Sequence, residues 1–478
     1  MKGLLPVRWR HARWAVVAAA LPLVWACNSR RLVEPNPRPT RTFDNVFQET
    51  VNRDVDILFM VDNSQSMQPL QGKLATNFPA FMNVLKTLPG GLPNVHIGIV
   101  SSDLGAGRAD GVSMCRQGGD QGAFQTAPRA PCMTSGLMPG QSFIQSVNGM
   151  ANFTGDIADV FTCMARLGDT GCGFEHQLAS VLKALEAPNM ANGFLRPNAF
   201  LSIILITNED DCSAPPDSDL FDPSSRLVMD PLGPLASYRC NEFGHLCNGM
   251  KPPRMAADLT AANCTSAEDG RLLRVSEAIA RTKALKIDPT KILVAAITGP
   301  VTPYIVKMTP ANGAGGIMED QPGIVHSCML NNGEYADPSI RIKEWVDAFG
   351  NNGVFLPICV DSFAPALARI AQEIGKVIGP KCVTGKLVDN DLATPGIQPD
   401  CQVADRAPNA GGTLIETPVP GCADNGNTPP CWALVDSPNC AGSKLLQVNR
   451  GGMMAPSDLN TRVECAICIA GINDDRCK

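Results

Sequence analysis

The side chains best suited to chemistry form a short polar run, Asp62-Asn63-Ser64-Gln65-Ser66, directly after an apolar segment at residues 55–61. One carboxylate and two hydroxyls stand at alternate positions, so a turn at the end of a strand would direct their oxygens toward a common point. Hard divalent cations prefer small oxygen ligands of this kind. The run therefore predicts a site for Mg2+, with Ca2+ or Mn2+ as alternatives.

The elements that would position this run alternate between short apolar segments and helical patterns. Near-continuous apolar runs predict strands covered on both faces, at Val55–Val61, Val95–Ser101, Phe200–Thr207, Ile292–Thr298 and Val354–Val360. Apolar residues spaced three and four apart predict helices at Leu70–Leu88, Glu175–Leu185, Arg271–Leu285 and Phe363–Ile378. This alternation indicates an α/β domain with a mostly parallel sheet.

Long polar insertions interrupt this domain at residues 105–140, 213–270 and 299–338. Loops of this length in a compact domain are usually functional or need stapling. Their cysteines predict stapling disulfides, although spacing does not determine which cysteines pair. Local pairs are possible, namely Cys115 with Cys132, Cys163 with Cys172, and Cys240 with Cys247.

The composition changes after residue 380, where eight cysteines fall in about a hundred residues and apolar runs become short. A segment this small and polar builds little core and depends on disulfides. We therefore expect a separate Cys-rich C-terminal module at residues 381–478. Cys465 and Cys468 have the spacing of a thioredoxin-type redox pair, but the residues that follow are turn-like, so we expect two structural disulfide halves.

The whole chain has the composition of a globular protein, with 478 residues, 44% hydrophobic and 18% charged. Its net charge of -6 and the lack of a basic stripe argue against nucleic acid as a partner. Of 19 cysteines, 18 remain when Cys27 is set aside, a density and parity suited to an oxidising compartment. None of the five histidines has zinc-ligand spacing with cysteines.

The N-terminus predicts export, because a basic segment precedes an apolar stretch at residues 15–26 that is short for a membrane-spanning helix. A short membrane anchor is the alternative. Val24-Trp25-Ala26-Cys27 resembles the lipobox of bacterial lipoproteins, which implies a signal peptide at 1–27, lipidation of Cys27 and a polar tether at 28–47. An ordinary signal peptide cleaved nearby would leave Cys27 without lipid.

Together, the strand, the Asp62-x-Ser64-x-Ser66 turn, the helix after it and the later strand at Phe200–Thr207 resemble a von Willebrand factor A domain over residues 48–380. The resemblance implies a doubly wound, Rossmann-like α/β domain with its site at the carboxyl edge of the sheet. In that family the D-x-S-x-S turn opens a metal-ion-dependent adhesion site, which a Thr from a later loop and an Asp after a further strand complete.

Thr170 is the candidate for that Thr, with Glu175 as a substitute oxygen donor. Asn208 takes the place of the family's Asp, because this chain has Thr207-Asn208-Glu209-Asp210-Asp211 where the family has Thr-Asp-Gly. An amide supplies an oxygen but no charge, so Glu209 or Asp210 would have to contribute, directly or through water. A solvated acidic loop is the alternative interpretation of this segment.

An incomplete ligand shell leaves the cation short of negative charge, and a carboxylate of a partner would complete it. The resemblance thus implies an exported, lipid-anchored binding or adhesion protein of the cell envelope, at the outer membrane, whose ligand is a protein or cell-surface molecule. The alternative is a structural envelope protein with a vestigial metal site. The sequence lacks a G-x-S-x-G elbow, an H-E-x-x-H helix and a phosphate-binding glycine loop, so we do not expect an enzyme.

Overall fold

The computed structural model describes residues 40–48, 53–88, 91–134, 136–186, 193–255, 259–310, 319–378, 382–409, 412–437, 440, 442–451, 459–469, 471 and 473–477. The expected signal peptide and Cys27 lie outside the described residues, as does most of the expected tether. The last part of that tether falls in strand β1 (Thr40–Gln48). Searching the described residues finds no helix long and apolar enough to cross a membrane.

The chain divides into two compact units. The larger comprises Phe43–Gly385 and Cys401–Cys465, and the smaller comprises Met1–Thr42, Lys386–Asp400 and Ala466–Lys478. The domain boundary that we predict at residue 380 does not coincide with the limits of these two units. It stays a prediction.

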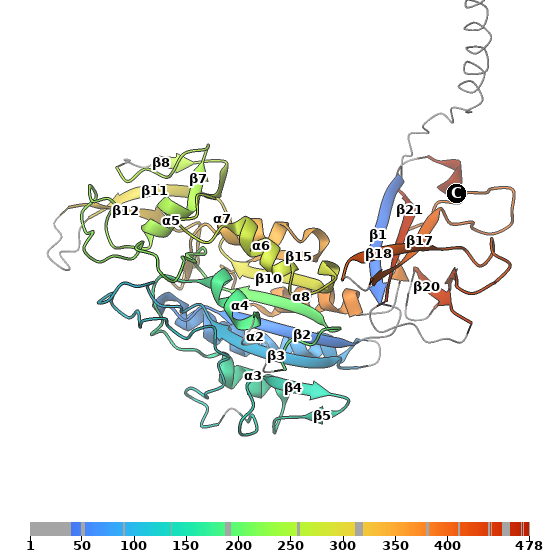
Figure 1. Cartoon of the computed structure of the whole chain (residues 1–478), viewed down its shortest axis with the longest axis horizontal. Helices are drawn as coiled ribbons and strands as arrows, with labels where there is room; N and C mark the ends of the chain where they lie inside the picture. The colour runs from blue at the N-terminus through green and yellow to red at the C-terminus, as the bar shows by residue number, and fades with distance from the viewer. Residues whose placement is uncertain are drawn as a thin grey trace, which may run out of the picture. The chain divides into compact units, whose positions relative to one another are not determined.

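A seven-stranded sheet forms the centre of the larger unit (Figure 1), in the order β15-β10-β6-β2-β3-β4-β5. The strands are β2 (Asp54–Val61), β3 (Asn94–Ser101), β4 (Ile144–Val147), β5 (Met150–Ala151), β6 (Phe200–Ile206), β10 (Ile292–Thr298) and β15 (Gly353–Pro357). From β15 to β3 all neighbours pair in parallel, whereas β4 and β5 are antiparallel. This sheet confirms the predicted α/β class and the five predicted strands.

Helices cover both faces of the sheet, which makes the domain doubly wound. One face packs on α2 (Gln68–Lys86), α3 (Ile157–Ala165) and α8 (Ala364–Ile378). The other packs on α4 (Gln177–Leu185), α6 (Val275–Lys283) and α7 (Ile340–Asp347). Along β2, Phe59 and Val61 belong to the first core and Leu58 and Met60 to the second, as expected for a strand buried on both sides.

The insertions carry short elements of their own. These are α5 (Tyr238–Gly244), β7 (His245–Cys247), β8 (Leu259–Ala261), β9 (Cys264–Ser266), β11 (Tyr304–Thr309), β12 (Gln321–Val325), β13 (Cys328–Met329) and β14 (Tyr335–Ala336). Arg239 is 1% exposed, and its guanidinium donates to five backbone carbonyls at 2.5–3.0 Å, including those of Leu220 and Pro234. The buried side chain of Arg239 thus donates hydrogen bonds to backbone carbonyls of these turn-rich segments.

All 18 cysteines other than Cys27 pair into nine disulfides. In the first 380 residues the pairs are Cys115–Cys172, Cys132–Cys163, Cys212–Cys240, Cys247–Cys264 and Cys328–Cys359. The three local pairs considered from the sequence are therefore wrong. The insertions fold back onto distant parts of the chain, so their cysteines meet partners 17–57 residues away.

Beyond residue 380 the strands are β16 (Cys382–Val383), β17 (Cys401–Pro408), β18 (Leu414–Val419), β19 (Cys431–Val435), β20 (Lys444–Asn449) and β21 (Asn460–Cys468). The pairs here are Cys382–Cys440, Cys401–Cys465, Cys422–Cys431 and Cys468–Cys477, so none of the nine disulfides crosses residue 380. Cys465 and Cys468 bond to different partners, as expected for structural disulfide halves.

Candidate metal-ion site at the switch point of the sheet

The polar run lies where the winding of the sheet reverses. Strand β2 is flanked by β3 on one side and β6 on the other, and the chain leaves β2 and β6 in opposite directions. Asp62 directly follows β2, and its N–H donates to the Ile206 carbonyl of β6 at 3.0 Å. Ligands of open α/β sheets bind in the crevice at this point, beyond the carboxyl ends of the strands.

Asp62 is fully buried and held only by neutral donors. Its Oδ1 accepts from the Ser64 N–H at 2.8 Å and the Ser102 hydroxyl at 3.3 Å, and its Oδ2 accepts from the Thr207 hydroxyl at 2.7 Å. In the part of the chain that the structure describes, no Lys, Arg or His forms an ion pair with this carboxylate. Burial raises the pKa of Asp62 and these hydrogen bonds oppose the rise, so a nearby cation would stabilise its charged form.

Three further oxygens converge beside this carboxylate. The Ser64 and Ser66 hydroxyl oxygens are 3.2 Å apart, and the Ser66 hydroxyl donates to Oδ1 of Asn208 at 3.0 Å. The amide of Asn208 is oriented by its other end, since Nδ2 donates to the Tyr335 carbonyl at 3.2 Å. The structure therefore brings together Asp62, both serines and Asn208.

Thr170 lies on the neighbouring loop and is exposed. The next residue, Gly171, donates its N–H to the Asn63 carbonyl at 2.9 Å, which places this loop against the polar run. Gln71 of α2 joins the two, because its Nε2 donates to the carbonyls of Asp62 and Gly168, each at 2.8 Å. The sequence analysis did not single out Gln71. The feature that could have identified it is a polar residue on the apolar stripe of a buried helix.

Glu175 and Glu209 place more negative charge beside Asp62. Burial and the charges of Glu209 and Asp62 raise the pKa of Glu175 well above its ordinary value. Burial and the charges of Asp337 and Asp62 do the same to the pKa of Glu209. Each carboxylate therefore disfavours the charged form of the other, and Oε1 of Glu175 is buried and has no hydrogen-bond partner among the described residues.

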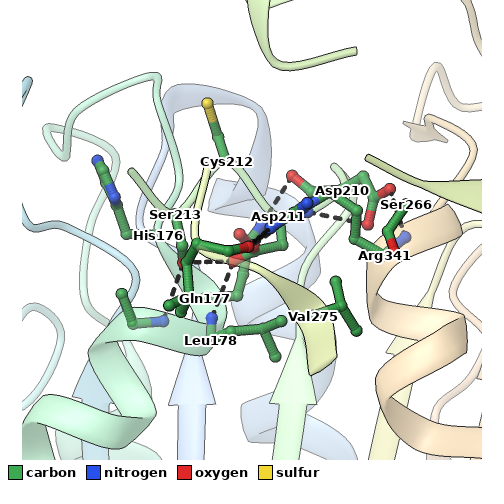
Figure 2. A network of polar contacts seen from close by, with 12 residues as sticks. His176, Gln177, Leu178, Asp210, Asp211, Cys212, Ser213, Ser266, Val275 and Arg341 are labelled. Atoms are coloured by element: carbon green, nitrogen blue, oxygen red, sulfur yellow. Dashed lines mark hydrogen bonds and ion pairs between the residues drawn. The ribbon is translucent and has the colours of Figure 1, made fainter. Parts of the chain in front are cut away.

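Asp210 and Asp211 do not form a solvated loop, and that interpretation is wrong. Figure 2 shows both carboxylates inside a network of buried polar contacts. Asp210 receives the N–H groups of Arg341 and Ile342 at the start of α7, at 2.9 and 3.1 Å, and Nε2 of His245 contacts its Oδ2 at 2.8 Å. The carboxylate of Asp210 is therefore committed to a helix cap.

The second carboxylate of this pair caps another helix. Oδ1 of Asp211 accepts from the Leu178 N–H of α4 at 2.9 Å and from the Ser213 hydroxyl at 2.6 Å. Its Oδ2 pairs with the Arg341 guanidinium at 3.0 Å, and neither side chain is exposed. The strand end therefore anchors two helices with Asp210 and Asp211, leaving only Glu209 of the acidic run to supply charge to a cation.

The donor set suits a hard cation rather than zinc. Within the described ranges, no group of three or more His, Cys, Asp or Glu side chains is arranged to hold a metal ion. The site consists instead of hydroxyl and amide oxygens beside the Asp62 carboxylate, with Glu175 and Glu209 nearby. Such oxygens fit the ligand preference of Mg2+, Mn2+ or Ca2+ and leave room for water or a partner group.

Comparisons with known proteins do not assign a family. No protein-family model and no curated protein matches the chain. Among solved structures, a von Willebrand factor type A protein from Catenulispora acidiphila is 9% identical with a TM-score of 0.26, covering 91% of this chain and 67% of that one.

Two further structures give similar values. The pilus adhesin RrgA from Streptococcus pneumoniae is 10% identical with a TM-score of 0.28, covering 89% of this chain and 58% of its own. Proximal thread matrix protein 1 from the mussel byssus is 12% identical with a TM-score of 0.29, covering 73% and 52%. This chain thus spans between about half and two thirds of the length of these proteins. TM-scores this low support no conclusion about this chain. The assignment of its fold is based on the strand order and pairing described above.

Proposed function

We propose that this chain is an exported, lipid-anchored binding protein of the cell envelope, attached at the outer membrane through Cys27. It binds a protein or cell-surface ligand through a divalent cation, Mg2+ or else Mn2+ or Ca2+. The observation that carries this proposal is the convergence of the Ser64, Ser66 and Asn208 oxygens beside the buried Asp62 carboxylate. Nine disulfides support export, because they form and persist in oxidising compartments.

The side chains divide the work of such a site. Ser64 and Ser66 would hold the cation directly, while Asp62, with both carboxylate oxygens already accepting hydrogen bonds, supplies charge from beneath. The bound cation would offer an open position to a carboxylate of the ligand. Thr170 stands exposed on the adjoining loop, where it can contribute a further hydroxyl.

The carboxyl pair Glu175 and Glu209 compensates for the neutral amide at Asn208. The raised pKa values of both side chains favour their protonated forms, and release of a proton would add negative charge beside the serines. A divalent cation at the serines favours release because it attracts the additional charge. The charge that Asn208 lacks is thus supplied from neighbouring positions.

Isothermal titration calorimetry with Mg2+ and Mn2+ tests this proposal. We expect saturable binding by the native protein and none by Asp62→Ala, because the variant loses the buried carboxylate that lies next to the two serines. Asp159→Ala is a matched control, since Asp159 is exposed on α3, outside the polar run and the loops that contact it. Equal heats from Asp62→Ala and the native protein would remove the cation from the function.

A structural envelope protein with a vestigial site is the second candidate. The neutral Asn208 favours it, as do the structural roles of Asp210 and Asp211. This candidate predicts that neither the native protein nor Asp159→Ala gives binding heat with Mg2+ or Mn2+.

A further inference from the structure

A second cavity of the larger unit lies beside α4 and α6, and the long insertions form its other walls. Its volume is about 880 Å3, and its lining comes from these helices and from parts of residues 104–121, 214–216 and 270–274. Of the described residues that line it, none belongs to the polar run at Asp62–Ser66. Sites for small organic molecules have volumes of about 300–1,000 Å3, so this cavity has the size of such a site.

Two disulfides hold the loops around this cavity. Cys115–Cys172 joins the first insertion to the segment before α4, and Cys212–Cys240 joins the segment after β6 to α5. The N–H of Leu273 donates to a backbone carbonyl of the segment after β6 at 2.7 Å, which connects two of the walls. A ligand would therefore enter a preformed cavity and would not have to order these loops.

Part of the lining is apolar or uncharged. Ala214 and Leu272, which are 8% and 1% exposed, line the cavity together with Leu104. His176 adds a neutral ring, because its Nδ1 accepts the Ala214 N–H at 3.2 Å and its Nε2 donates to the Gly105 carbonyl at 2.9 Å. Burial lowers the pKa of His176, which agrees with the neutral form. These residues can cover the apolar body of a ligand.

The charged side chains of the lining leave one positive charge in excess. They are Lys183, Arg274 and Arg281 against Glu186 and Glu277. Arg281 is committed to the carboxylates, since its Nε and Nη2 donate to Glu186 at 2.9 and 2.5 Å and its Nη1 donates to Glu277 at 3.3 Å. The excess charge matches a ligand with a single negative charge, whereas a dianion such as phosphate would be repelled by the two glutamates.

The guanidinium of Arg274 is oriented and still has free donors. Its Nε donates to the Glu268 carbonyl at 2.9 Å. It lies over Gly270, where a Cβ atom would come within 3.3 Å of Nη2. Neither Nη atom has a hydrogen-bond partner among the described residues, and the side chain is exposed. The N–H groups of such a fork match the paired oxygens of a carboxylate or sulfonate.

We propose that this cavity binds a small organic monoanion, a carboxylate or sulfonate with an apolar body. The anionic group pairs with Arg274, and the body lies against His176, Ala214 and Leu272. The two sites share no lining residue from the polar run, so binding of this ligand does not require the cation. The chain thus carries a small-molecule site in addition to the candidate cation site.

Fluorescence titration of the full chain with anilinonaphthalene sulfonate tests this assignment. This probe joins one sulfonate to an apolar body, and phenylnaphthylamine is the same body without the charge. We expect saturable binding of one sulfonate probe per chain, with an affinity about 10-fold lower in Arg274→Gln, the effect of losing hydrogen bonds to a charged group. The affinity of the neutral probe should stay within about 2-fold of the native value in this variant.

Arg226→Gln is the matched control. Arg226 is also exposed, its Nε also donates to a backbone carbonyl, that of Pro223 at 3.2 Å, and it does not line the cavity. The affinity of both probes for this variant should stay within about 2-fold of the native value. An equal loss for the charged and the neutral probe in Arg274→Gln, or no loss for the charged probe, would overturn the pairing with Arg274.

A second variant tests whether the probes occupy this cavity. Ala179 is half-buried on α4 and lines it, so the ring of Ala179→Phe would fill part of the space. We expect both probes to bind this variant at least about 10-fold more weakly. A misfolded variant would enhance the fluorescence of the sulfonate probe, so a loss reports on the cavity. Native affinity in Ala179→Phe, or no saturable binding by the native protein, would overturn the proposal.

Discussion

The buried pair between Asp211 and Arg341 allows a sharp test of how the strand end is held. Asp211→Asn preserves the shape and keeps a carbonyl oxygen for the Leu178 N–H and the Ser213 hydroxyl. It removes the charge that faces the Arg341 guanidinium at 3.0 Å. The substitution therefore isolates the ion pair from the helix cap.

The expected cost follows from burial. Both side chains of the pair are 0% exposed, and the Arg341 guanidinium retains only the Leu273 carbonyl at 2.5 Å, while Nη1 has no partner. Leaving one member of a buried ion pair without its partner costs about 3–5 kcal/mol. That loss is a large fraction of the ~5–15 kcal/mol that stabilises folded proteins.

Urea unfolding under non-reducing conditions, followed by circular dichroism, measures this cost. With an m value of about 3 kcal/mol/M, the midpoint should fall by about 1 M or more. Asp347→Asn is the matched control, because its partner Lys343 lies four residues before it on the same helix and Asp347 is 58% exposed. Its free energy of unfolding should change by no more than about 0.5 kcal/mol. A change below about 1 kcal/mol for Asp211→Asn would refute the reasoning, since water or another acceptor would then have to satisfy Arg341.

Other parts of the chain give independent predictions. Burial lowers the pKa of Lys286 to about 8, although the nearby Asp56 opposes the shift. Because the folded state holds fewer protons than the unfolded state above this value, the free energy of unfolding should rise by about 2 kcal/mol between about pH 8 and pH 10. In Lys286→Met this rise should be absent, and an identical pH profile would contradict the assignment. Intact mass after alkylation without reductant should show no adduct on the 18 cysteines other than Cys27, and several adducts would contradict the nine disulfides. Labelling with a fatty-acid analogue should depend on Cys27, and a Cys27→Ser protein that is still labelled would exclude lipidation at this residue.

Most of the central sheet could be predicted because its signal is local. The run from Val55 to Val61 is apolar on both faces, and β2 occupies Asp54–Val61 as a strand between two helical layers. The helices α3 and α7 were not predicted. In α3 the residues Ile157–Ala165 are almost all apolar, so their periodicity does not separate a helix from a buried strand. The strands beyond residue 380 were missed because they are only partly buried and their apolar runs are short.

The candidate site was predicted in part. Asp62, Ser64 and Ser66 share a turn, so their proximity follows from the sequence, and Asn208 joins them because parallel strands end at the same edge. The roles of Gln71 and Ser102 could not be predicted, since each reaches the polar run from another element. The acidic run shows the same limit: composition predicts charge, but only packing shows that Asp210 and Asp211 each cap a different helix.

The sequence by itself determined most strands and helices of the central α/β domain, and it placed the Asp62-x-Ser64-x-Ser66 turn at the end of a strand, because both depend on residues close together in the chain. The tertiary structure alone decided the disulfide partners and the burial of Asp210 and Asp211. These depend on which distant segments meet at the carboxyl edge of the sheet. The physical reason is that side-chain periodicity acts over a few residues, whereas hydrogen bonds and disulfides depend only on distance in space.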